Sequence, residues 1–130
     1  MTSLRIVLMI GMFGAIGALA RYWLSGLCYR WFGGGFPAGT LAVNVIGCFL
    51  LGLLVFLLNA GSLAESWRTP LAIGLLGSLT TFSTFGYETF KLLETSNWSS
   101  ALANVGSNLA LGLLAVWAGV HFGRLLVGGG

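Results

Sequence analysis

Five hydroxyl side chains and a glycine interrupt an otherwise apolar part of the chain. The run reads Gly77-Ser78-Leu79-Thr80-Thr81-Phe82-Ser83-Thr84-Phe85. Hydroxyl groups offer the backbone alternative hydrogen-bond partners, and glycine permits unusual backbone angles, so the run predicts a break in a helix. In hydrocarbon an unpaired backbone group costs several kcal/mol, so a break is expected only where it faces protein, an ion or water. The run therefore marks a candidate functional site.

Two phenylalanines in this run, Phe82 and Phe85, are three residues apart. If the helix resumes there, both rings share one stripe. Aromatic residues at this spacing are ordinarily core or lipid-facing, but these alternate with hydroxyl groups. The edge of an aromatic ring is electropositive, so two rings presented edge-on would stabilise a small anion. A pore lysine would instead bind the anion too tightly to release it.

Asparagines recur on the predicted helices at positions where lipid would be expected. Asn44 follows Thr40 by four residues, and Asn108 follows Asn104 by four, so each pair shares a helix face. Asn44 is expected to point into the bundle, either in an interhelical hydrogen bond worth about 0.6 kcal/mol or in a functional site. Asn104 and Asn108 predict a polar track.

Glu88 is the one acidic residue that falls inside a predicted span. It could carry protons, pair with Arg21, or lie at the interface held by water. No serine has a histidine base nearby in a recognisable pattern, no two acids are usefully spaced, and neither a nucleotide loop nor a metal cluster occurs. The sequence therefore predicts no enzyme.

Composition indicates an integral membrane protein. Of the 130 residues, 57% are hydrophobic and only 7% are charged, which is too few to cover a water-facing surface. A soluble domain carries about 25% charged residues. The net charge of +3 comes from scattered residues and does not favour nucleic acid binding. Cys28 and Cys48 lie in apolar surroundings and are expected to be packed free thiols.

Four stretches are apolar and long enough to cross a bilayer, which takes roughly 20 residues. They are residues 4–24, 40–59, 70–90 and 100–120. The connections are too short for an extramembrane domain, and most tryptophans fall at span ends, as an interfacial belt would. We therefore predict an all-α membrane protein: one domain over residues 1–130, with four transmembrane helices and the third broken in the middle.

Positive charges are divided equally between the two sides of this bundle. One side carries Arg5, Arg68 and Arg124, and the other carries Arg21, Arg30 and Lys91. The positive-inside rule therefore gives no preferred orientation. The tie indicates either insertion in both orientations, which would permit antiparallel dimers, or an accidental balance. Recurrent glycines, such as Gly11, Gly14 and Gly17, are expected to let helices pack closely.

Three motifs on three spans resemble the CrcB/Fluc family of fluoride channels, across nearly the whole chain. Residues 74–88 read GLLGSLTTFSTFGYE, residues 37–47 read PAGTLAVNVIG, and residues 14–21 read GAIGALAR. The resemblance implies an antiparallel, dual-topology homodimer in the bacterial inner membrane. Such a dimer would conduct fluoride passively through two pores and confer fluoride resistance.

The resemblance also implies site residues. Phe82 and Phe85 would line the fluoride path, Asn44 would donate from its amide, and the polar track would include Thr40, Ser83, Thr84, Glu88, Asn104 and Asn108. Arg21 would lie near the vestibule, as a source of positive field or in an ion pair. A structural sodium ion would be held at the dimer centre by the backbone carbonyls of Gly77 and Thr80. Members often carry tyrosine and serine where this chain has Asn104 and Asn108.

Two rival functions are compatible with a small four-span protein. A small multidrug exporter requires a membrane-embedded glutamate in its first span, and residues 4–24 contain no acidic residue. A non-conducting packing protein would show no change in ion flux on replacement of Phe82 or Phe85. Fluoride conduction, with fluoride, sodium, lipid and a second copy of the chain as partners, is the function that the resemblance favours.

Overall fold

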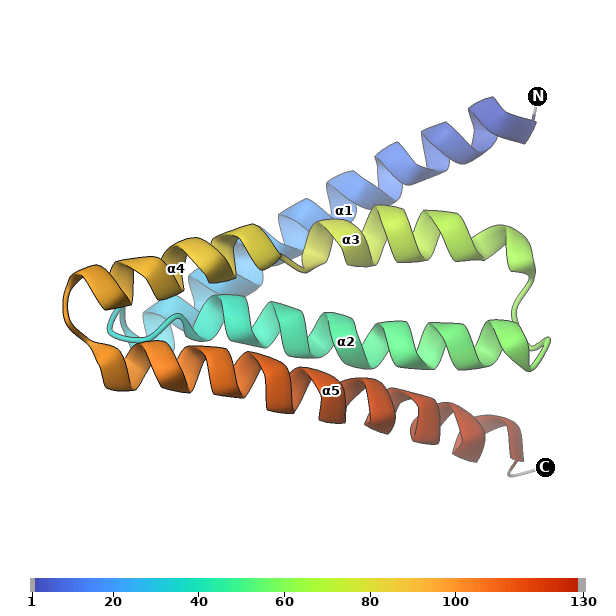
Figure 1. The fold of residues 1–130 in the computed structure, drawn as a ribbon. Coiled ribbons are helices and arrows are strands. Elements are labelled where there is room, and N and C mark those ends of the chain that lie inside the picture. The colour runs from blue at the N-terminus through green and yellow to red at the C-terminus, as the bar shows by residue number, and fades with distance from the viewer. Residues whose placement is uncertain (1, 129–130) are drawn as a thin grey trace.

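The computed structural model describes residues 2–128 and is built from helices, with no strand in that range (Figure 1). The elements are α1 (Thr2–Phe32), α2 (Ala38–Asn59), η1 (Glu65–Trp67), η2 (Pro70–Leu76), α3 (Gly77–Leu79), α4 (Phe82–Glu94) and α5 (Trp98–Gly128). The all-α prediction is confirmed.

The chain runs from end to end of the bundle four times. In Figure 1 both termini and the turn that contains η1 lie at one end, and the α1–α2 and α4–α5 connections lie at the other. The third pass consists of η2, α3 and α4 in succession, with α4 continuing the direction of the shorter pieces.

Three of the helices, α1, α2 and α5, are long and apolar enough to cross a membrane. The third predicted span, 70–90, is not one helix because the backbone is extended at Thr80 (φ −84°, ψ 158°) and Thr81 (φ −153°, ψ 115°). The break thus lies within the predicted run 77–85, at Thr80 and Thr81, and Gly77 itself is helical. The element before α3, η2, is a π-helix, a form that often accompanies functional sites.

Helix α1 extends further than the predicted span 4–24. It continues to Phe32 and ends where Gly33 adopts a φ of +72°, so the predicted connection 25–39 shortens to residues 33–37. Its 31 residues measure about 46 Å at 1.5 Å per residue, whereas the hydrocarbon layer is about 30 Å thick. The additional turns carry the exposed aromatic residues Tyr29 and Trp31, which suit the lipid headgroup region.

Close helix contacts depend on glycines that face a neighbouring backbone. A Cβ atom on Gly52 of α2 would meet the carbonyl oxygen of Val116, and one on Gly119 of α5 would meet that of Phe49. Between α1 and η2, a Cβ on Gly17 would meet the carbonyl oxygen of Leu75. Gly11 has no such neighbour within 4 Å, so the prediction of close packing was wrong there.

The pattern of burial is that of a membrane protein. The core between α2 and the third pass is small and contains Val43, Leu54, Leu58, Leu76 and Leu79. Large apolar side chains instead cover the outside of the bundle, such as Leu8, Leu113 and Leu125. Such an exterior is compatible with lipid rather than water, and together with three long apolar helices it identifies a multi-pass membrane protein.

Candidate functional site

The Asn44 side chain of α2 forms hydrogen bonds with backbone groups at the break in the third pass. The Thr81 backbone N–H donates to the Asn44 Oδ1 atom at 2.8 Å, and the Asn44 Nδ2 atom donates to the Thr81 carbonyl at 3.2 Å. Thr81 is buried, so its peptide groups need partners from the protein. The Asn44 side chain thus replaces the backbone partner that the Thr81 N–H loses at the break and gives the Thr81 carbonyl a further donor.

The hydroxyl groups of the polar run form the cap of α4. The Thr84 N–H donates to the Thr81 Oγ1 atom at 3.1 Å, which satisfies one free amide of the first turn. The Thr81 hydroxyl donates in turn to the Thr84 Oγ1 atom at 2.9 Å, and Ser83 Oγ lies 3.4 Å from it. Thr80 Oγ1 donates back to the Leu76 carbonyl at 3.0 Å. The run therefore breaks one helix and begins the next.

Four backbone carbonyls, those of residues 77–80, lose their helical partners at the break, and two of them belong to the predicted cation site. In a continuous helix the Gly77 carbonyl would accept from the Thr81 N–H, and the Thr80 carbonyl would accept from the Thr84 N–H. Those two amides donate instead to Asn44 Oδ1 and to Thr81 Oγ1. In residues 2–128 no cluster of three or more His, Cys, Asp or Glu side chains could hold a metal.

A ladder of side-chain amides connects Asn44 to α5 and α4. Asn44 Nδ2 donates to Asn108 Oδ1 at 3.0 Å, and Asn108 Nδ2 donates to Asn104 Oδ1 at 3.0 Å. Asn104 Nδ2 then donates to Thr89 Oγ1 at 2.9 Å, and the Thr89 hydroxyl donates to the Phe85 carbonyl at 2.8 Å. The two asparagines of α5 do lie on one polar face. Thr89 was missed, although its position one turn after Phe85 places it on the same face of α4.

The paired phenylalanines lie beside this ladder in a groove of about 340 Å³. The ring centroids of Phe82 and Phe85 are 5.5 Å apart with an interplanar angle of 50°, so the two rings share one stripe as expected. Asn44 and Asn108 line the same groove. The Phe82 side chain is 82% exposed on this single chain.

A second hollow, of about 520 Å³, opens where α1, α2 and α4 meet at the break. Arg21, Thr40 and Thr84 line it, together with Thr81, which also lines the phenylalanine groove. Of the four, Thr40 and Thr81 are buried. The structure thus brings together a cation and three hydroxyl groups from three separate passes.

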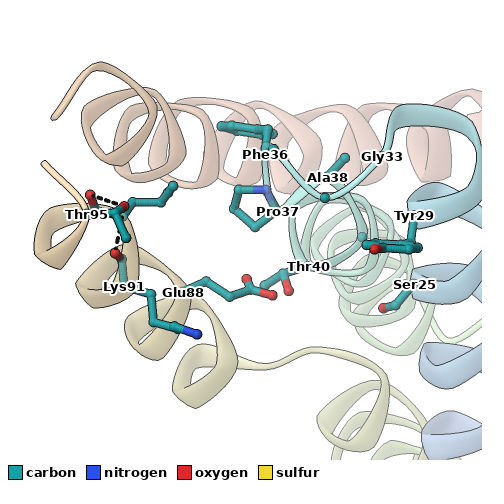
Figure 2. Close-up of a pocket in the computed structure, with 14 residues that line it drawn as sticks. Ser25, Tyr29, Gly33, Phe36, Pro37, Ala38, Thr40, Glu88, Lys91 and Thr95 are labelled. Carbon is teal, nitrogen blue, oxygen red and sulfur yellow. Dashed lines mark hydrogen bonds between the residues drawn. The ribbon is translucent and has the colours of Figure 1, made fainter. Parts of the chain in front are cut away.

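A third hollow, of about 450 Å³, lies at the end of the bundle near the α1–α2 connection (Figure 2). Thr40 is shared with the second hollow, and Glu88 and Lys91 of α4 line the opposite wall. Figure 2 shows the side chains of Glu88 and Thr40 pointing toward one another. The buried Glu88 Oε2 atom has no hydrogen-bond partner.

The possible ion pair between Glu88 and Arg21 is absent. The one ion pair in residues 2–128 joins Glu65 and Arg68, in the turn between α2 and η2. Glu88 lies on the third hollow and Arg21 on the second, with Thr40 on both. The ion-pair alternative for these two residues was therefore wrong.

Two predicted pore residues line none of the three hollows. Asn104 is 0% exposed and uses its amide within the ladder. Ser83 is exposed on the first turn of α4, beside the Thr81 hydroxyl. The other predicted side chains, namely Arg21, Thr40, Asn44, Phe82, Thr84, Phe85, Glu88 and Asn108, each line at least one of them.

Comparison with known proteins relates this chain to one family. Residues 8–120 match the family model described as CrcB-like protein, Camphor Resistance (CrcB). The chain is 50% identical over 121 residues to the "Fluoride-specific ion channel FluC" of Geobacter sulfurreducens, a match that covers 92% of this chain and 98% of the relative. A protein of the same name from Geotalea daltonii is 46% identical over 124 residues, covering 95% and 100%. The chain therefore belongs to the CrcB family.

Proposed function

We propose that this protein is a fluoride channel that exports fluoride passively from the cytoplasm across the bacterial inner membrane and so confers fluoride resistance. The observation that carries the proposal is the succession of three hollows, joined by shared residues and lined by hydroxyl groups, amides and phenyl rings. The names of the relatives supply the ion. The family is one of ion channels rather than enzymes.

The hollows suggest a route for the ion. Thr81 is common to the phenylalanine groove and the second hollow, and Thr40 is common to the second and the third. An ion would pass from the rings of Phe82 and Phe85, past the two threonines, to the end of the bundle where Lys91 lies. Arg21 on the second hollow would attract anions through its field without lining the groove.

The lining groups suit a small, strongly hydrated anion. Because the Thr81 hydroxyl donates to Thr84 Oγ1, the Thr84 hydroxyl keeps its own proton to donate into the second hollow. The electropositive ring edges of Phe82 and Phe85 would stabilise the anion weakly enough for release. Both amide hydrogens of Asn44 are already engaged, so contact between this amide and fluoride requires one partner to be given up.

A dimer with a central sodium ion is part of the proposal. Gly77 and Phe82 are exposed on this single chain, beside the break. An antiparallel copy crossing at the break would cover both and would contribute the Gly77 and Thr80 carbonyls a second time. The four oxygens would supply the sodium ligands without a carboxylate. The ion would fix the two breaks against each other, and fluoride would not pass through it.

Passive export requires only the membrane potential. Moving one elementary charge through 100 mV is worth about 2.3 kcal/mol, and an inside-negative potential drives an anion outward. Fluoride enters acidified cells as the neutral acid and dissociates in the more alkaline cytoplasm. A selective passive pore is therefore sufficient to lower the internal concentration.

Fluoride efflux from liposomes tests the proposal. Purified protein is reconstituted at low density, and release is followed with a fluoride electrode and, in parallel, a chloride electrode. We expect fast fluoride release, retained chloride, and loss of release in Phe82→Ile. Phe90→Ile is the matched control, because Phe90 is also an exposed phenylalanine of α4 but does not line the groove. Trapped fluoride in liposomes that contain folded wild-type protein would refute the proposal.

A further inference from the structure

We infer that Thr89 is a positioning residue: it fixes the orientation of the buried Asn104 amide, and through Asn104 and Asn108 it supports the Asn44 amide, which pairs with the Thr81 peptide at the helix break. Its effect on conduction rests on the proposed function, whereas its effect on the break does not. The inference depends on the direction of each hydrogen bond in the ladder.

The direction is fixed at the Thr89 end by a backbone carbonyl. The Phe85 carbonyl can only accept, so the Thr89 hydroxyl donates to it at 2.8 Å and has only its lone pairs left for Asn104. Asn104 must therefore present its Nδ2 atom to Thr89, at 2.9 Å. This leaves Asn104 Oδ1 facing Asn108.

The same argument applies next to Asn108 of α5 and then to Asn44 of α2. Asn104 offers Asn108 two acceptors, its Oδ1 at 3.0 Å and its own carbonyl at 2.9 Å, so Asn108 presents Nδ2 to both. Asn108 Oδ1 is then left to accept from Asn44 Nδ2 at 3.0 Å. Asn44 Oδ1 then accepts from the Thr81 N–H at 2.8 Å, the same orientation that lets Asn44 Nδ2 donate to the Thr81 carbonyl at 3.2 Å. Each amide thus has one orientation that satisfies all of its partners.

Burial makes the wrong orientation costly. Asn104 is 0% exposed, so its amide has no water to replace a lost partner. If the Thr89 hydroxyl is removed, Asn104 Nδ2 loses its acceptor, and rotating the amide would set its donors against those of Asn108. Asn108 and Asn44 keep their backbone partners, but the ladder that supports them loses its bond to α4, so the bond to the Thr81 N–H weakens.

Amide exchange at Thr81 tests the inference independently of ion flow. In protein labelled at threonine, we expect the Thr81 N–H of the wild type to exchange slowly, and Thr89→Val to accelerate it by about threefold to tenfold, the factor that one net hydrogen bond is worth. Thr89→Ser keeps the hydroxyl and should restore the wild-type rate. Thr95→Val is the matched control, because Thr95 Oγ1 likewise donates to the carbonyl four residues earlier but lies outside the ladder.

Fluoride efflux provides the second readout. Thr89→Val is expected to slow release several-fold per folded channel, with Thr89→Ser close to wild type. Unchanged Thr81 exchange in Thr89→Val, or equal acceleration in Thr95→Val, would overturn the inference. If Thr89→Val does not fold, hydrogen exchange in the wild-type protein still tests the inference. A Thr81 N–H that exchanges as fast as an unprotected loop amide would rule out the ladder. Faster exchange in Thr89→Val with no fluoride release by the wild type would support the ladder and refute only the proposed function.

Discussion

Replacement of Asn44 by valine should destabilise the protein more than any other polar substitution on α2. The change removes three hydrogen bonds at once. Two of them satisfy the peptide groups of Thr81, at 2.8 and 3.2 Å, and the third joins Asn108 at 3.0 Å. Valine is apolar and similar in size to asparagine, so the loss of hydrogen bonds dominates the effect on stability.

The magnitude follows from the number of bonds and the burial of Thr81. An interhelical hydrogen bond in a membrane protein averages about 0.6 kcal/mol, and one in a soluble protein about 1 kcal/mol. Three bonds therefore correspond to about 2–3 kcal/mol of the free energy of unfolding. The lower value holds if the Thr81 N–H recovers a partner by closing the break and bonding the Gly77 carbonyl. That relaxation would straighten the third pass and remove a candidate sodium ligand.

Reversible unfolding in mixed micelles, followed by tryptophan fluorescence, measures this difference. Asn59→Ala is the matched control, because Asn59 is the asparagine at the other end of α2 and accepts only one long bond, at 3.4 Å from Arg68. We expect Asn59→Ala to stay close to wild type. If Asn44→Val is as stable as Asn59→Ala, the claim that Asn44 stabilises the break is wrong.

Three further predictions concern packing, charge and the cation. Gly119→Ala should cost about 1–3 kcal/mol of unfolding free energy because its Cβ would meet the Phe49 carbonyl oxygen, whereas Gly11→Ala should be neutral in the same assay. The Arg68 guanidinium holds the pKa of the Glu65 carboxyl below its ordinary value, so the pair stabilises its turn above that ordinary pKa and ceases to do so as the pH falls through the lowered one. Arg68→Gln should therefore return the Glu65 pKa, followed by NMR titration, toward its ordinary value; an unchanged pKa would exclude the guanidinium as the cause. Replacing sodium by a large organic cation should weaken dimerisation in single-molecule photobleaching, and dimers equally stable in both media would argue against the structural sodium ion.

Much of the fold follows from local sequence. Runs of about 20 apolar residues cannot be soluble, and their number and spacing required four passes with short connections. The hydroxyl-rich run predicted the broken third pass because it offers competing partners to the backbone. The ends of the helices were less predictable: nothing in residues 25–32 stops a helix, so α1 continues until Gly33.

The candidate site was predicted unevenly. Spacing placed Phe82 and Phe85 on one stripe and Asn104 and Asn108 on one face, because both relations lie within a single helix. The sequence could not show that Asn104 is fully buried, or that Thr89 anchors it from another helix. Contacts between helices depend on rotation about each axis, which a single sequence does not specify.

The sequence by itself predicted a membrane protein with four passes, because the transfer free energy of apolar segments decides membrane insertion. It also predicted that one of these passes is a broken helix, because backbone hydrogen bonding is decided within one segment. The tertiary structure alone decided what happens at the break. It showed that the Asn44 amide pairs with the Thr81 peptide and that the threonines Thr40 and Thr81 connect three hollows. Residues 37 positions apart meet only when α2 packs beside the third pass, and that juxtaposition is fixed by the shape of the whole bundle.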